Sequence, residues 1–145
     1  MTWQVIAVVP RTPHRGGVET RGSIDEYAEA WQRGDLEAML DAYAPDVVTH
    51  YGGTSPFAGD HRGRDALVEI LVETARRGDR QLVSVDAVHD SGDHGAIFVT
   101  ESFTVDGAPV TVDRCLRYRV EQGRISEIWL YDRQQHLVDR AWSGA

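Results

Sequence analysis

The stretch IFVTESFTVDGAPVTVDRCLRY, residues 97–118, decides the fold. Folding it about Gly107-Ala108 predicts a β-hairpin with apolar and aromatic side chains paired on one face, because strand side chains alternate between the two faces of a sheet. The predicted pairs on that face are Val105/Val110, Phe103/Val112, Val99/Leu116 and Ile97/Tyr118. The other face is mostly polar and is expected to face solvent.

One charged pair interrupts the apolar face of this hairpin. In the predicted register Glu101 lies opposite Arg114. Burying charge is expensive unless the charge is paired, and a desolvated ion pair is weak evidence of stability. A pair of this kind in a cavity is a candidate functional site, and a purely structural ion pair is the alternative.

Composition excludes several classes of function. The 145 residues predict one domain, and a net charge of -8 makes nucleic acid and anionic membranes poor partners. The sequence has neither lysine nor asparagine, which excludes Schiff-base chemistry on a lysine and a P-loop. Its only cysteine, Cys115, excludes an intrachain disulfide and a cysteine-cluster metal site. We therefore expect no cofactor and no metal.

The first 22 residues differ from the rest. Residues 1–22 contain Pro, Gly and Arg without sustained periodicity, which predicts a flexible or extended N-terminal arm ahead of a single domain at 23–145. The apolar run Val5–Val9 is too short for a signal peptide or a membrane span, so a cytoplasmic protein is expected.

The remaining chain predicts helices followed by a strand meander. Ser23 and Glu26 form a predicted capping box for a helix that ends at Gly34, and Asp35 caps a second helix that Pro45 stops. Further predicted elements are a strand at 46–51, a loop at 52–62, a helix at 63–77, strands at 81–89, 95–105, 110–121 and 124–132, and a short helix at 134–142. This order predicts an α+β fold, with the helices against one face of a curved sheet.

Several segments carry a family resemblance. They are Tyr27–Leu36, 43–47, His50–Gly59, 62–65, Leu116–Val120, 123–125, Glu127–Asp132 and Leu137–Trp142. In this order and spacing the chain resembles the SnoaL-like polyketide cyclase and ketosteroid isomerase group of the nuclear transport factor two-like superfamily. The resemblance implies a cone-shaped α+β barrel, with three N-terminal helices on a curved, mostly antiparallel sheet. It also implies a mostly apolar pocket and a homodimer formed through the sheet.

Ketosteroid isomerase uses an aspartate base and an oxyanion hole made of a tyrosine and a protonated aspartic acid. By its spacing to Gly34, Tyr27 matches the oxyanion tyrosine. The position of the base holds His50 and Tyr51, and Arg114 takes the place of the protonated acid. Two of the three functional residues therefore differ.

The residue types at these positions suggest their roles. His50 is the best candidate general acid or base, because histidine titrates near working pH. Arg114 stays charged and suits a carboxylate, an enolate or an alkoxide. Glu101 either orients Arg114 or acts as a base, and a tight pair with Arg114 would make its role mostly structural.

The role of Asp132 depends on the turn at Gln122-Gly123. A plain two-residue turn sends Trp129 and Tyr131 to the Arg114 face, whereas a glycine bulge sends Leu130 and Asp132 there. Similarity to the isomerase strand favours the bulge. Limonene epoxide hydrolase, in the same superfamily, activates water with an Asp–Arg–Asp set, to which Arg114 and Asp132 could contribute, with Glu101 as an unorthodox third member.

The ligand is expected to be small, apolar and oxygenated. Candidate pocket walls are Tyr27, Trp31, Phe57, Tyr118, Trp129 and Tyr131, although aromatic residues in such elements are more often ordinary core. The first hypothesis is cofactor-independent proton transfer beside a carbonyl, in which His50 or Asp132 moves the proton. The alternatives are water attack on an epoxide and a non-catalytic binding or assembly module.

Overall fold

The computed structural model describes residues 22–143, so the predicted arm lies outside the described residues except for Gly22. The elements, in chain order, are α1 (Ser23–Arg33), α2 (Leu36–Asp41), β1 (Tyr43–Tyr51), β2 (Gly59–Arg62), α3 (Arg64–Gly78), β3 (Gln81–Asp90), β4 (His94–Val105), β5 (Ala108–Glu121), β6 (Arg124–Asp132) and α4 (Gln135–Ser143). None of the helices in this part of the chain is long and apolar enough to span a membrane.

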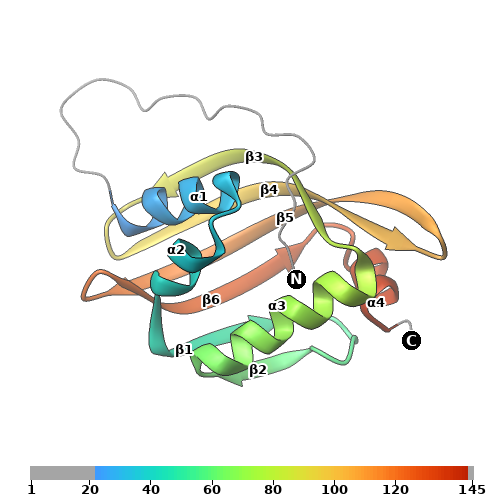
Figure 1. The fold of residues 1–145 in the computed structure, drawn as a ribbon, viewed down its shortest axis with the longest axis horizontal. Helices are drawn as coiled ribbons and strands as arrows, with labels where there is room; N and C mark the ends of the chain where they lie inside the picture. The colour runs from blue at the N-terminus through green and yellow to red at the C-terminus, as the bar shows by residue number, and fades with distance from the viewer. Residues whose placement is uncertain (1–21, 144–145) are drawn as a thin grey trace.

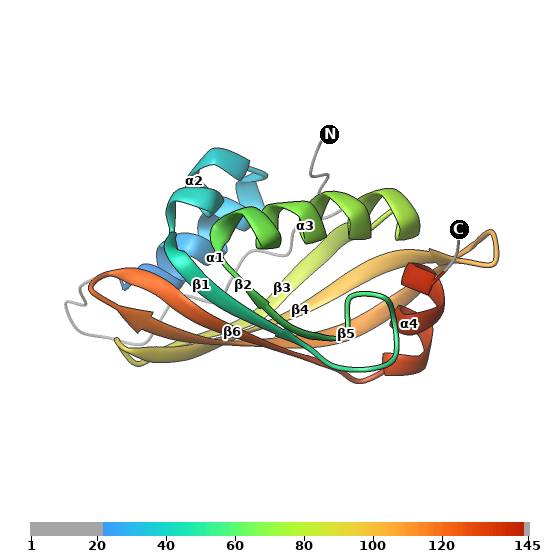
Figure 2. The ribbon, with the colours of Figure 1, turned by 90° about the horizontal axis from the view of Figure 1, so that it is seen from below.

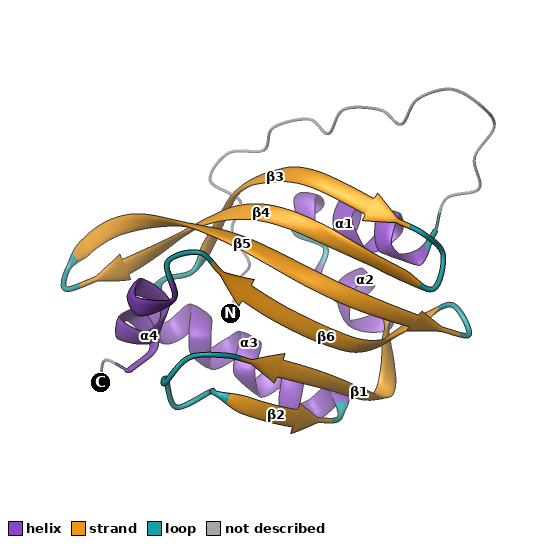
Figure 3. Ribbon diagram, turned by 180° about the vertical axis from the view of Figure 1, so that it is seen from behind, coloured by secondary structure: helices purple, strands orange, loops and turns teal. Residues whose placement is uncertain are grey.

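The strands form one open, curved sheet in the order β2-β1-β6-β5-β4-β3 (Figure 1). All neighbouring strands are antiparallel except β1 and β6, which are parallel. Figure 2 shows α1, α2 and α3 on one side of the sheet. Figure 3 shows the opposite face, which these three helices leave uncovered. This arrangement confirms the predicted α+β class.

The central hairpin keeps its predicted faces but not its predicted register. Val105 pairs with Ala108, so the turn is Asp106-Gly107, one residue earlier than predicted. Both turn residues have positive φ, 52° and 81°, as a type I′ turn requires, and Asp-Gly is a preferred sequence for that turn. The pairing slips by two residues, which preserves the side-chain alternation. Glu101 and Arg114 are therefore diagonal neighbours on one face rather than directly opposite.

A bulge in β6 decides which of its side chains face the helices. Arg119 pairs with Glu127, but the next residue, Val120, pairs with Ile125, so Ser126 is the extra residue. The parity of the strand therefore changes, and Leu130 and Asp132 face inward as the bulge alternative predicted. The predicted place of the bulge was wrong, because Gln122-Gly123 is a plain two-residue turn between Glu121 and Arg124 and the bulge lies at Ser126. Ile128 and Leu130 are buried beneath the helices as a result.

Three local predictions were wrong. The N-cap of α1 is Gly22, and the Ser23 hydroxyl instead donates to the carbonyl of Gly123, so there is no capping box. Pro45 does not stop α2, because the helix has already ended at Asp41 and Pro45 lies within β1. The predicted loop contains the edge strand β2. The cap of α2 is confirmed, because the Asp35 carboxylate accepts from the Ala38 N–H.

Candidate functional site

A small cavity lies between the helices and the sheet. About 20 Å³ of it is open to the centre of a water-sized sphere, which is room for roughly one water molecule. Its walls are mainly apolar but carry several phenol groups and one guanidinium. The lining residues are Tyr27, Trp31, Met39, Tyr43, Thr49, Tyr51, Leu67, Leu71, Arg80, Leu116, Ile128 and Leu130.

Helix α1 supplies the aromatic wall of the cavity. Tyr27 and Trp31 are four residues apart, so they share one face of the helix, and their rings lie 6.2 Å apart. The hydroxyl of Tyr27 is hydrogen-bonded to that of Tyr43, and its ring contacts Tyr118 edge-on at 5.5 Å. Burial raises the pKa of Tyr27 to about 12, so the phenol is a neutral hydrogen-bond donor at neutral pH.

Strand β1 supplies the opposite wall, but not through His50. Thr49 and Tyr51 point into the cavity, whereas His50 lies on the outer face of the sheet. The strand begins at Tyr43 and pairs Thr49 with Ile128, which fixes this parity. The structure therefore does not bring His50 together with Arg114 or Tyr27, as the sequence interpretation required.

On the outer face, His50 is held between two carboxylates. Its Nδ1 lies 2.6 Å from Asp60 of β2, and its Nε2 lies 2.5 Å from Glu127 of β6. A neutral imidazole carries only one N–H, so the ring can donate to both carboxylates only in its imidazolium form. Partial burial opposes that charge, but the bonds to Asp60 and Glu127 raise the pKa of His50 above its usual value. The imidazole also stacks on Trp129, at 5.4 Å between ring centroids.

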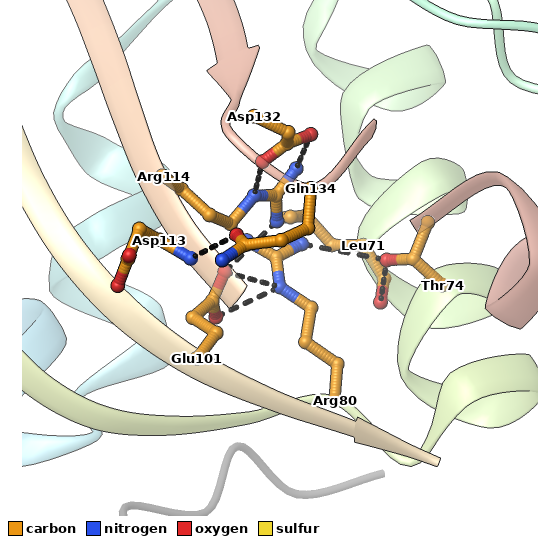
Figure 4. Close-up of polar contacts among 8 residues, drawn as sticks. All are labelled: Leu71, Thr74, Arg80, Glu101, Asp113, Arg114, Asp132 and Gln134. Carbon is orange, nitrogen blue, oxygen red and sulfur yellow. Dashed lines mark hydrogen bonds and ion pairs between the residues drawn. The ribbon is translucent and has the colours of Figure 1, made fainter. Parts of the chain in front are cut away.

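Four charged side chains form a buried chain beside the cavity (Figure 4). Arg80 donates its Nε–H to both oxygens of Glu101, at 3.1 and 2.9 Å. Arg114 donates from Nη1 to Glu101 at 2.8 Å, and from Nε and Nη2 to the two oxygens of Asp132 at 2.5 and 3.2 Å. The two positive and two negative groups balance, so the chain Arg80–Glu101–Arg114–Asp132 is neutral overall.

The environment of this chain fixes its protonation. Burial alone would raise the pKa of Glu101, but the charges of Arg80 and Arg114 hold it below its usual range. Arg114 also lies over the rings of Phe103 and Trp142, at 5.5 and 5.2 Å. Both effects keep the carboxylate and the guanidinium ionised although neither is exposed to solvent.

Arg80 links the charged chain to the cavity, and the sequence interpretation did not identify it. Among the four members of the chain, only Arg80 lines the cavity. It directly follows Asp79, which has a left-handed backbone at the end of α3, and it also donates to the Thr74 hydroxyl at 3.4 Å. No sequence motif identifies Arg80, because only the turn between α3 and β3 brings its side chain to Glu101.

The predicted aromatic walls lie in four different places. Tyr27 and Trp31 line the cavity, and Tyr118 is buried against Tyr27 without lining it. Phe57 lies in the loop before β2 and packs edge-on against Trp142 of α4. Trp129 and Tyr131 of β6 point away from the helices, so the prediction that they line the pocket was wrong. Trp129 lies under the guanidinium of Arg117 at 4.4 Å, and Tyr131 is 52% exposed.

Comparison with known proteins supports the same fold. The family model described as a SnoaL-like domain matches residues 24–128. A Xanthomonas campestris protein of unknown function with a cystatin-like fold is 28% identical over 84% of this chain and 98% of its own, with a TM-score of 0.76. An NTF2-like protein from Burkholderia thailandensis is 24% identical over 84% of this chain and 98% of its own, with a TM-score of 0.72.

A more distant structure shares the fold alone. TerC, crystallised with polyporic acid, is 18% identical over 80% of this chain and 95% of its own, with a TM-score of 0.66. No curated protein matches the sequence. Because the SnoaL-like model spans more than half of the chain, the protein belongs to the SnoaL-like family.

Proposed function

We propose that the protein binds a small, largely apolar molecule with an enolisable carbonyl, and catalyses proton transfer beside that carbonyl. One observation carries this proposal: an apolar cavity presents the Tyr27 phenol and the Arg80 guanidinium to the same enclosed space. Preorganised donors and positive charge in a site without bulk water stabilise an oxyanion as it develops. Isomerisation and ring closure through an enolate both need that stabilisation.

The proposed division of roles uses groups on both sides of the cavity. Tyr27, supported by Tyr43, donates to the developing oxyanion, and Arg80 supplies positive charge. Asp132 is the proposed proton acceptor, because it is a carboxylate held in a fixed orientation by two hydrogen bonds from Arg114. It does not line the cavity as it stands, so this role needs the cavity to expand toward the charged chain. A substrate requires the cavity to expand, since typical small-molecule sites occupy about 300–1,000 Å³.

The comparisons give this proposal its context. The chain belongs to the SnoaL-like family, and TerC, which shares the fold, was crystallised with an organic ligand, polyporic acid. Fold alone does not assign a reaction, so the proposal depends on the residues in the cavity.

Exchange of carbon-bound protons provides the test. We would incubate 1-indanone with the protein in D₂O and follow loss of the proton signal next to the carbonyl by NMR. Wild type should accelerate exchange, and Tyr27→Phe should slow it by about 10²-fold, the usual effect of losing one oxyanion donor. Asp132→Asn should slow it by a similar or larger factor. His50→Gln, on the outer face, is the matched control and should leave the rate unchanged.

Two outcomes would overturn the assignment. Equal exchange rates for wild type and Tyr27→Phe would remove Tyr27 from the reaction. A large loss in His50→Gln would place the chemistry on the outer face of the sheet. Circular dichroism of each variant separates loss of activity from loss of fold.

A second candidate reaction is the opening of an epoxide by water. The supporting observation is that Glu101, Arg114 and Asp132 form one connected carboxylate–guanidinium–carboxylate set. Incubation with cyclohexene oxide in ¹⁸O-labelled water tests it, since hydrolysis places one labelled oxygen in the diol. A diol formed at the buffer rate would exclude this reaction for that epoxide class.

A third candidate is binding without turnover. The supporting observations are the small cavity and the complete pairing of Glu101 with two arginines. Binding of 1-indanone with proton exchange at the buffer rate would favour this candidate over the first.

A further inference from the structure

Two residues that line the cavity each carry a buried polar atom without a hydrogen-bond partner. Neither Thr49 Oγ1 nor Trp31 Nε1 has a hydrogen-bond partner among residues 22–143. Thr49 is 1% exposed and Trp31 is 2% exposed, so solvent on the protein surface does not satisfy either atom. Buried polar groups are nearly always paired, so an unpaired atom on a cavity-lining residue is a position where a bound molecule can supply the partner.

The position of these atoms connects them to the site. Trp31 lies one helical turn from Tyr27 on α1, and Thr49 lies two residues from Tyr51 on β1, so each shares a face with a phenol of the cavity. The groups that the first proposed reaction directs at the oxyanion, Tyr27 and Arg80, are not hydrogen-bonded to either of these two atoms. The cavity therefore carries more hydrogen-bonding capacity than a single carbonyl oxygen can use.

We propose that Thr49 and Trp31 are specificity-determining residues that bind a second oxygen of the ligand. An indole N–H can only donate, so the ligand atom that faces Trp31 is an acceptor, whereas the threonine hydroxyl both donates and accepts. The ligand class is thus a compact compound with two separated oxygens, at least one of them a carbonyl, such as a 1,3-diketone or a hydroxyketone. This inference rests on the proposed function, since it places that ligand in the same cavity.

A matched pair of probes tests it. 1-Indanone and 1,3-indanedione share one ring system and differ by one carbonyl. Their dissociation constants would be measured by calorimetry for wild type, Thr49→Val, Thr49→Ser and Trp31→Phe. Thr49→Val should weaken binding of 1,3-indanedione about tenfold relative to wild type and leave 1-indanone within about twofold, and Thr49→Ser should restore it. Trp31→Phe should likewise weaken binding of 1,3-indanedione more than binding of 1-indanone.

The control outcomes separate the two proposals. If Thr49→Val weakens both probes equally, or neither, the second-oxygen role is wrong while the cavity remains the binding site. That result would indicate that Thr49 binds an ordered water. If wild type binds neither probe, the proposed function fails for this carbonyl class and the inference fails with it. Thermal unfolding of each variant verifies that valine, close in shape to threonine, preserves the fold.

Discussion

Replacing Glu101 with glutamine should cost this protein much of its stability. Glu101 is completely buried and accepts three hydrogen bonds, two from Arg80 and one from Arg114. Glutamine keeps the shape but removes the charge, so two guanidinium groups would remain with the carboxylate of Asp132 alone. The buried chain would change from neutral to a net charge of +1.

The size of the effect follows from that uncompensated charge. Breaking a buried ion pair by removing one partner costs about 3–5 kcal/mol. With an unfolding entropy of about 2.1 cal/mol/K per residue, the 145 residues give roughly 0.3 kcal/mol/K. The expected fall in Tm is therefore about 10–16 °C for Glu101→Gln.

The effect should also depend on pH in one direction. The pKa of Glu101 is lowered in the folded protein, so its ionised form adds stability above the pKa of the unfolded chain, about 4.3. That stability is lost as pH falls through the lowered pKa of the folded state. The difference between wild type and Glu101→Gln should thus be full at pH 7 and shrink below about pH 4.

Urea denaturation followed by tryptophan fluorescence measures the difference at each pH. The matched control is Glu73→Gln on α3, whose carboxylate pairs with Arg76 and Arg77 at the surface, and which should unfold close to the wild-type midpoint. A loss of stability below about 1 kcal/mol for Glu101→Gln, the size typical of a surface pair, would refute the view that Glu101 neutralises buried positive charge in this chain.

Three further predictions concern β6, His50 and the outer face. Deleting Ser126, the extra residue of the bulge, leaves Arg119 paired with Glu127 and Val120 paired with Ile125 in a regular ladder, so Leu130 and Asp132 should still face the helices. A cooperative unfolding transition with a Tm close to that of wild type is expected, and loss of that transition would contradict the assignment of Ser126 as the extra residue. His50 has a raised pKa in the folded protein, so the stability lost in His50→Gln should be largest below about pH 6.5 and decline as pH rises through that raised value. Urea midpoints of wild type and variant from pH 6 to 9 would check this, and a difference between them that does not change with pH would argue against the imidazolium. The homodimer expected from the family resemblance would cover Phe98 and Tyr131, which are 41% and 52% exposed; light scattering should give a dimer for wild type and a monomer for Phe98→Asp, and a monomeric wild type would exclude it.

Alternating strands were the part of the fold most accessible from sequence. The hairpin from Ile97 to Tyr118 alternates so regularly that a register error of two residues left its faces intact. That error arose because Asp106-Gly107, not Gly107-Ala108, has the preferred type I′ sequence. The edge strand β2 was not predicted, because its sequence Gly-Asp-His-Arg has no apolar alternation to mark it.

The site was harder to predict, because pairing with a strand distant in the sequence decides which side chains of β1 face the helices. Val47 and Val48 are both apolar, so the sequence permits either His50 or its neighbours to face the helices, and the pairing of Thr49 with Ile128 settles the choice. The joint placement of Glu101 and Arg114 was predictable from alternation within one hairpin. Arg80 was not, because it reaches Glu101 from a turn twenty-one residues earlier in the chain.

A crystal structure of the protein soaked with 1,3-indanedione tests the central claim most directly. The compound should lie in the cavity between α1 and β1, with one oxygen within hydrogen-bond distance of the Tyr27 hydroxyl and the other facing Thr49 and Trp31. Clear density for the compound on the outer face beside His50, or a cavity that remains closed at saturating compound, would contradict it.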